Sequence, residues 1–178
     1  GVLTDDGVVC RVEPMALPVS HPLARIDGSL NTVRIEGDPV GAVTLTGPGA
    51  GAGPTASAVM GDVAKMFRPA IRPAFGRAEH HMARPFTEAR GDEVSAFFLS
   101  MRLADKPGAL AALSESLAAE GVSVDKILQD SADESGASPV AIVTHRCARS
   151  NMQAALARLQ KFAIPVDPPR LIRIEAAS

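Results

Sequence analysis

The glycine-rich stretch GPGAGAGPTASAVMGD, which begins at Gly47, is the part of the chain best suited to hold a ligand. Gly47, Gly49 and Gly51 alternate and leave no Cβ in the way of an approaching molecule, while Pro54 has a φ suited to the first helical position. An apolar helix should follow and run to about Phe67. Its first-turn amides lack internal partners, so an anionic or carbonyl-bearing ligand would be favoured there. Close packing of a strand against a helix would explain the same glycines.

Two nucleotide-binding motifs do not fit this turn. A P-loop requires Lys followed by Ser or Thr, but here the last glycine is followed by Pro54 and Thr55. A dinucleotide fingerprint can be placed only loosely on Gly47, Gly49 and Ala52, because no strand with a terminal acidic residue follows about 20 residues later. The turn could therefore line a cofactor site, but it is not itself a Rossmann turn.

Composition excludes several classes of partner. The 178 residues carry a formal net charge of -2, and only 3% of them are aromatic, with neither Trp nor Tyr. Because nucleic-acid binders use basic patches and aromatic stacking, we expect no nucleic-acid partner. No apolar run approaches the roughly 20 residues that span a bilayer, so we expect no membrane partner either.

Cysteine and histidine usage gives no metal site. Cys10 and Cys147 are far apart, which argues against a disulfide framework and favours a reduced, cytoplasmic setting. The adjacent His80 and His81 have no Cys, Asp or His at ligand spacing around them, so a solvated pair is favoured over a metal site.

The first 67 residues read as short strands followed by one helix. Strands are expected over 8–12, 32–36 and 40–46, separated by turns such as Asp27-Gly28. One helix over 54–67 cannot cover such a sheet, so its remaining strands should lie in another segment. Because the chain opens on Gly1 within strand-like residues, it looks like part of a longer protein.

A linker and then a regular pattern follow. Prolines and scattered arginines interrupt all periodicity over 68–93, which predicts a linker. Beyond it the order is strand, helix, strand, strand, helix, strand, which predicts a ferredoxin-like βαββαβ sandwich with an antiparallel sheet and both helices on one face. We expect strands over 96–103, 122–129, 140–145 and 169–175, and helices over 109–120 and 151–162. Gly121 should end the first helix and Ser150 should cap the second. Their core faces should carry Leu110, Leu113 and Leu117, and Met152, Leu156, Leu159 and Phe162.

Two segments resemble known families. The run VEPMALPVSHPLARIDGSLNTVRIEGD, continuing into GPGAGAGPTASAVMGD, resembles the C-terminal part of the catalytic domain of bacterial homoserine dehydrogenase. The run LADKPGALAALSESLAAEGVSVDKILQ, with VAIVTH and LIRIE, resembles an ACT domain, a small-molecule sensor. The resemblance implies an α+β chain: a partial mixed or antiparallel sheet with one helix from the catalytic domain over 1–67, the linker over 68–93 and an ACT regulatory domain over 94–176.

The implied activity is the NAD(P)-dependent interconversion of L-aspartate 4-semialdehyde and L-homoserine, in threonine and methionine biosynthesis. By resemblance, Gly51 is the best candidate for a main-chain contact with the cofactor, with Gly49, Ala50 and Thr55 nearby. The dinucleotide-binding half and the family's catalytic lysine have no counterpart here, so we assign no catalytic residue. We expect these residues alone to be inactive and to hold no cofactor tightly. His21 and Asp27 lie in the matched run and are interpreted as structural.

The ACT resemblance implies an amino-acid effector, threonine being the obvious candidate, and a homo-oligomer through the ACT and catalytic domains. The amides of Gly108, Ala109 and Leu110 at a helix N-terminus suit a carboxylate, and Asp105 could take an ammonium group. Alternatively, Asp105 only caps the helix and the domain is a dimer contact.

A different class of function is an alternative. The chain could be a freestanding amino-acid sensor in which residues 1–67 form an unrelated dimerisation sheet. That alternative predicts that residues 1–67 close a core of their own, whereas an enzyme fragment predicts an exposed apolar face.

Overall fold

The computed structural model describes residues 1–4, 7–67, 92–162 and 164–175. The chain divides into two compact units: unit 1 comprises residues 1–9 and 19–89, and unit 2 comprises residues 10–18 and 90–178. The predicted linker, apart from Asp92 and Glu93, lies outside the described residues, and so does the His80-His81 pair.

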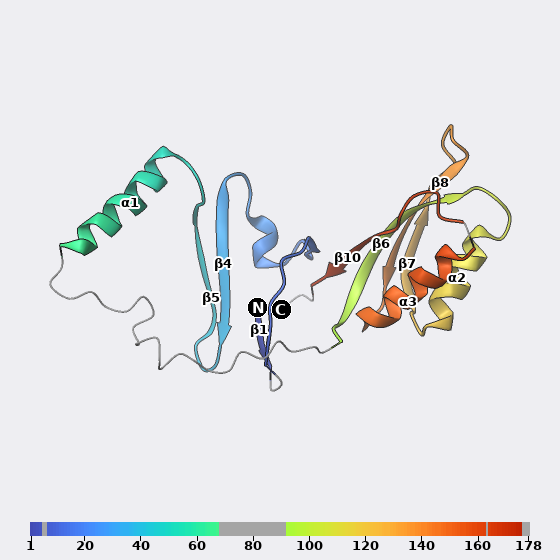
Figure 1. Cartoon of the computed structure of the whole chain (residues 1–178), viewed down its shortest axis with the longest axis horizontal. Coiled ribbons are helices and arrows are strands. Elements are labelled where there is room, and N and C mark those ends of the chain that lie inside the picture. Colours follow the sequence, from blue (N-terminus) through green and yellow to red (C-terminus); the bar gives the residue numbers. More distant parts are fainter. Residues whose placement is uncertain (5–6, 68–91, 163, 176–178) are drawn as a thin grey trace. The chain divides into compact units, whose positions relative to one another are not determined.

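The described residues of unit 1 form two hairpins and one α-helix (Figure 1). Strand β1 (Val2–Thr4) pairs antiparallel with β2 (Gly7–Val9), and β4 (Leu30–Gly37) pairs antiparallel with β5 (Gly41–Pro48). A short 3-10 helix, η1 (Pro22–Arg25), precedes β4, and α1 (Ala52–Met66) follows β5. The expected antiparallel strands and single helix are confirmed, although the described strands form two separate two-stranded sheets and the first expected strand already ends at Val9.

The β4–β5 hairpin follows from alternation of apolar and polar residues. In its register Val33 lies opposite Leu45 and Ile35 opposite Val43, so four apolar side chains share one face. The other face is polar, and the hydroxyl groups of Thr32 and Thr46 are 2.9 Å apart across the strands. The hairpin is therefore amphipathic.

Helix α1 begins two residues earlier than the sequence predicted. Gly51 is its N-cap, which makes Pro54 the third helical residue rather than the first. A proline is accepted there because the first amides of a helix have no partner in the preceding turn. The first helical hydrogen bond is donated by the Thr55 N–H to the Gly51 carbonyl, at 3.1 Å.

Unit 2 has the predicted ferredoxin-like architecture, with two helices on one face of a sheet (Figure 1). The strand order is β3-β10-β6-β8-β7, and all neighbours are antiparallel except β3 and β10. The short strand β9 also pairs with β6. The elements in chain order are β3 (Met15–Ala16), β6 (Val94–Ala104), α2 (Ala109–Ala119), β7 (Val124–Gln129), β8 (Ala137–Thr144), β9 (Cys147–Ala148), α3 (Arg149–Gln160) and β10 (Arg170–Ile174).

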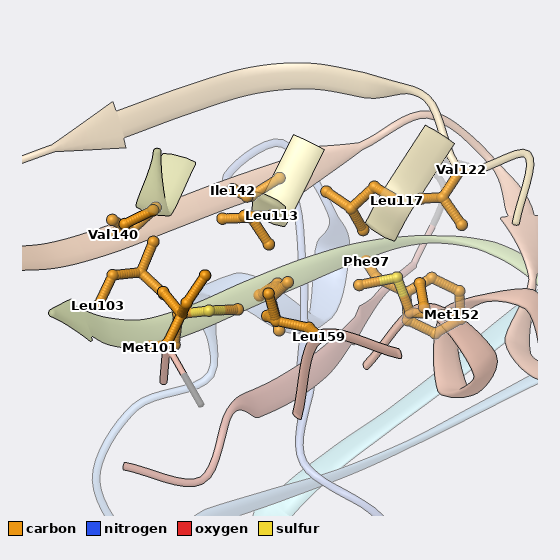
Figure 2. Packing of buried hydrophobic residues seen from close by; sticks show 14 of the residues in the cluster. Phe97, Met101, Leu103, Leu113, Leu117, Val122, Val140, Ile142, Met152 and Leu159 are labelled. Carbon is orange, nitrogen blue, oxygen red and sulfur yellow. The ribbon is translucent and has the colours of Figure 1, made fainter. Parts of the chain in front are cut away.

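The core of unit 2 lies between the sheet and the two helices (Figure 2). Alternate residues of β6 face the helices, and Phe97 and Leu99 have no exposed surface. Leu113 and Leu117 of α2 meet them, together with Met152, Ala155 and Leu159 of α3. Of the other residues expected in the core, Leu156 is partly buried against it, whereas Leu110 is 37% exposed and Phe162 is 41% exposed. Leu110 lies in the first turn of its helix, and Phe162 follows the end of α3, so neither is held over the sheet.

The predicted end of α2 is confirmed. Gly121 has a φ of +69°, a left-handed conformation that favours glycine. The Gly121 N–H donates to the Ala118 carbonyl and the Val122 N–H donates to the Leu117 carbonyl, which satisfies two of the last carbonyls. Val122 is itself buried, so the turn carries the chain directly into the core.

The predicted start of α3 is wrong by two residues. Ala148 is the N-cap and its side chain makes no capping bond, while Ser150 is already helical. The carboxylate of Asp92 takes the capping role from a distant position. It accepts the Ser150 N–H at 3.1 Å and also the Ser150 hydroxyl. These bonds explain why the pKa of Asp92 is held below its usual range.

No helix among the described residues is long and apolar enough to cross a membrane.

Candidate functional site

The glycine turn connects β5 to α1 and is exposed. The Gly49 N–H donates to the Ser29 carbonyl at 3.0 Å, which fixes the start of the turn against the segment before β4. The Asn31 side chain lies against Gly49, where a Cβ would come within about 2.0 Å of its amide nitrogen. Gly51 has a φ of +124°, which a residue with a side chain rarely adopts. The backbone therefore favours glycine at position 51, whereas a side chain at position 49 would displace the Asn31 amide.

The N-terminus of α1 has no compensating group from its own residues. The N-cap Gly51 has no side chain to accept an amide, and the first turn carries no acidic residue. The expected cofactor residues Gly49, Ala50, Gly51 and Thr55 are all exposed around this helix start. Such a helix end favours a negatively charged or carbonyl-bearing ligand.

The apolar face of the β4–β5 hairpin is uncovered. Val33 is 57% exposed and Leu45 is 65% exposed, whereas Thr32 and Arg34 on the polar face are partly buried. Helix α1 has no buried residue, and it carries a second exposed apolar stripe made of Val59, Met60, Val63 and Met66. Among the described residues, every buried hydrophobic side chain lies in unit 2. The described residues of unit 1 therefore close no hydrophobic core of their own, as an enzyme fragment predicts.

The expected effector residues lie where β6 runs into α2. Gly108 is the N-cap of α2, and no side chain makes a capping bond there, so the alternative that Asp105 caps this helix is not what the structure shows. Asp105 is exposed, and its N–H donates to the Gly136 carbonyl at 3.0 Å. The Ala109 N–H donates to the Lys106 carbonyl at 3.2 Å, and Ala109 is buried. Of the three expected amides, that of Ala109 is thus already used.

Near this loop, Arg102 forms a cluster with two aspartates and a serine that the sequence did not predict. Arg102, on the sheet face away from the helices, donates to Asp167 at 3.1 Å, to the Ser135 hydroxyl at 2.7 Å and to Asp133. Hydrogen bonds from Ser135 and then from Arg102 lower the pKa of Asp133 to about 2. Arg102 and Asp167 also line a surface cavity of about 560 Å³. No signal in the sequence pairs residues that lie 31 and 65 positions apart.

The other titratable candidates have local roles. The His21 Nδ1 accepts the Leu23 N–H at 3.2 Å and the side chain is buried, which supports its interpretation as structural. Cys10 is exposed and Cys147 is buried, and both are free thiols. Burial raises the pKa of the Cys147 thiol, which makes it unreactive. The described residues contain no cluster of three or more His, Cys, Asp or Glu that could hold a metal ion.

Family models match both units. Residues 2–64 match the model for homoserine dehydrogenase, and residues 97–163 match the model for the ACT domain. The match over 2–64 contradicts the alternative in which the first 67 residues are an unrelated dimerisation sheet.

Relatives extend over almost the whole chain. A homoserine dehydrogenase from Neisseria gonorrhoeae is 32% identical over 97% of this chain and 41% of its own length. One from Mycobacterium tuberculosis is 32% identical over 98% of this chain and 41% of its own length. The chain thus spans about two fifths of the relatives that it matches.

A solved structure agrees with these relatives. The crystal structure of a homoserine dehydrogenase from Thiobacillus denitrificans matches 99% of this chain and 41% of that chain, with 28% identity and a TM-score of 0.72. The chain therefore matches the C-terminal part of homoserine dehydrogenases, with a segment that fits the homoserine dehydrogenase model followed by an ACT domain.

Proposed function

We propose that this chain is the cofactor-facing and regulatory part of a cytoplasmic, NAD(P)-dependent homoserine dehydrogenase. The whole enzyme interconverts L-aspartate 4-semialdehyde and L-homoserine, on the route to threonine and methionine. The observation that carries this proposal is the exposed glycine turn before an uncapped helix, within residues that match the homoserine dehydrogenase model. Residues 1–67 belong to the catalytic region, 68–93 join the two parts, and 94–176 form the regulatory domain.

The main chain at Gly49, Ala50 and Gly51 forms a wall against which the nicotinamide cofactor lies. A nicotinamide cofactor, when bound, supplies hydride transfer to and from the aldehyde carbon. The residues of this chain position the cofactor and do not react with it. The glycines let the cofactor come close to the main chain, and the first-turn amides near Thr55 offer it hydrogen-bond donors. Other parts of the enzyme cover the apolar face of the hairpin and supply the catalytic lysine. The 178 residues alone therefore have no dehydrogenase activity.

Substitutions in the turn test the wall in the intact enzyme. Gly51→Val should raise the cofactor KM by on the order of tenfold or more, but its positive φ means that backbone strain contributes to this effect. Ala50→Leu adds bulk at the same place without a positive φ, and it should raise the cofactor KM while leaving the KM for the aldehyde nearly unchanged.

Gly61→Ala is the matched control, because Gly61 lies in α1 outside the turn and its Cβ would meet nothing within 4 Å. We expect its kinetic constants to equal those of the wild type. An unchanged cofactor KM in Ala50→Leu would overturn the cofactor wall.

The ACT domain binds an amino acid, and threonine is our proposed effector. An amino-acid carboxylate would be met by the amides of Gly108 and Leu110, since that of Ala109 is already used. The exposed Asp105 carboxylate is placed to take the ammonium group. The domain also contributes to a homo-oligomer together with the catalytic region.

Isothermal titration of the 178-residue chain with threonine tests this site. We expect saturable heat for the wild type and for Glu115→Gln, which alters an exposed carboxylate on the same helix. Asp105→Asn should weaken binding by on the order of tenfold through the loss of one charge-assisted hydrogen bond. Absence of heat with the wild type would favour a purely structural domain.

A further inference from the structure

Residues 10–18, called here the coupling strand, belong to unit 2 although the chain on both sides of them belongs to unit 1. The strand β3 within this segment pairs parallel with β10, with Met15 opposite Arg173 and Ala16 opposite Ile174. The Glu175 N–H donates to the Ala16 carbonyl at 3.0 Å. The ferredoxin-like sheet thus gains a further strand from a segment that lies more than 70 residues earlier.

Side-chain charges hold this segment in place. Glu13 accepts a hydrogen bond from Arg149 at 2.7 Å and another from Arg173 at 3.2 Å. Glu93 pairs with Arg173 at 3.2 Å and with Arg11 of the coupling strand. These five side chains are only 16–30% exposed, so solvent screens them less than ordinary surface pairs. Burial raises the pKa of Glu13, but Arg149 and Arg173 outweigh it and hold the pKa below its usual range.

The two arginines that hold Glu13 come from different elements of the regulatory fold. Arg149 is the first residue of α3, and its guanidinium lies 5.8 Å from the ring centroid of the buried Phe97 on β6. Arg173 lies in the middle of β10. A single carboxylate from the homoserine dehydrogenase part is therefore connected to one helix and two strands of the ACT fold.

We propose that the coupling strand transmits effector binding from the ACT domain to the catalytic region. Because its pairing with β10 and the ion pairs of Glu13 tie it to the ACT fold, a shift of α3 or β10 must move the chain on either side of it. The remainder of that chain, from β2 on one side to η1 on the other, belongs to the catalytic region. This role rests on the proposed function, since it presupposes an enzyme with an amino-acid effector.

Hydrogen exchange in the 178-residue chain tests the attachment. In the wild type, peptides covering 10–18 and 170–175 should exchange slowly together. Glu13→Gln keeps the shape but removes the charge, and it should speed exchange in both peptides by on the order of tenfold, the loss expected for one hydrogen bond to a charged group. Glu36→Gln removes an equivalent charge from the Arg34–Glu36 pair in unit 1 and should leave both peptides unchanged.

Two outcomes would overturn the attachment. One is that residues 10–18 exchange in the wild type as fast as an unstructured peptide. The other is that Glu13→Gln and Glu36→Gln give the same exchange in 170–175.

Inhibition of the intact enzyme tests the transmission. The Glu13→Gln enzyme should keep its basal kcat and bind threonine within about twofold of the wild-type Kd, but its residual activity at saturating threonine should be at least severalfold that of the wild type. Inhibition equal to that of the wild type would overturn the coupling role and leave the proposed function standing. If the wild-type enzyme binds no amino acid, both the proposed effector and the proposed transmission by the coupling strand are overturned. The attachment of residues 10–18 to the ACT fold would then still be decided by hydrogen exchange.

Discussion

Both units contain strands in which apolar and polar residues alternate, but the apolar side chains are buried in unit 2 and exposed in unit 1. In β6 of unit 2, every second side chain from Phe97 to Leu103 is buried under two helices. In the β4–β5 hairpin of unit 1, Val33 and Leu45 alternate with polar residues in the same way but stay exposed. Alternation therefore determines which face of a strand is apolar, whereas burial depends on a covering layer. In unit 2 the same chain supplies that layer, whereas the described residues of unit 1 supply none, and we propose that other parts of the enzyme do.

The largest expected effect is on the free energy of unfolding, which should distinguish buried from exposed apolar residues. Leu99→Ala should lower the free energy of unfolding of the 178-residue chain by about 2–5 kcal/mol, because it leaves a cavity in a closed core. Val33→Ala should change it by less than about 0.5 kcal/mol, because Val33 is largely exposed. Urea unfolding followed by far-ultraviolet circular dichroism measures both changes.

The intact enzyme is the control for this comparison. There Val33→Ala should become costly, since we propose that other parts of the enzyme cover the hairpin. A cost above about 1 kcal/mol for Val33→Ala in the 178-residue chain would show that unit 1 already buries this face, and the contrast between the units would fail.

A smaller effect is expected at the helix starts. Asp92→Ala removes the carboxylate that accepts the Ser150 N–H, so the melting temperature should fall by a few degrees, less than for Leu99→Ala. Helix α1 in unit 1 has no such side-chain cap. Replacing its N-cap neighbour, Ala50→Ser, should leave the melting temperature unchanged within about one degree. Differential scanning calorimetry measures both, and an equal fall in the two variants would contradict the assignment of Asp92 as a cap.

The smallest expected effect is a local dependence on pH in unit 2. The folded-state pKa of Asp133 is lowered from 3.8 to about 2, so its ionised form stabilises the loop at every pH above 3.8. That contribution should disappear as the pH falls from about 4 through about 2. The amides of Ser135 and Ala137, which donate to Asp133, should exchange faster over this interval, as followed by nuclear magnetic resonance.

Asp133→Asn should remove this dependence on pH. A loop that stays equally protected at pH 2 and pH 5 would show that the carboxylate does not hold it.

Most of unit 2 was predictable because its elements form from local signals. The alternating residues of β6, the leucines of α2 and the glycine after it predict the strand, the helix and the helix end to within two residues. The prediction failed at Ser150, where a local capping residue was assumed. The cap is Asp92 instead, 58 positions away, and no sequence pattern reports such a contact. The additional strand from residues 10–18 escaped prediction for the same reason.

The candidate sites also contain features that the local sequence predicts and features that only the fold brings together. The glycine turn was found because its special backbone must be encoded locally, and Gly51 does adopt a positive φ. The cluster of Arg102 with Asp133 and Asp167 was missed because it is assembled by the fold. The use of the Ala109 amide by Lys106 was also missed, since turn hydrogen bonds depend on exact backbone angles.

Strand β3 is an edge strand of the sheet in unit 2, and this affects how ACT domains can be exchanged between related proteins. An ACT domain that begins at residue 92 would lack β3 and would expose the edge of β10, and unpaired strand edges promote association between copies. A chimaera that exchanges ACT domains between relatives must therefore carry two separate stretches of chain, residues 10–18 and the residues from 90 onward, to keep the edge of β10 paired.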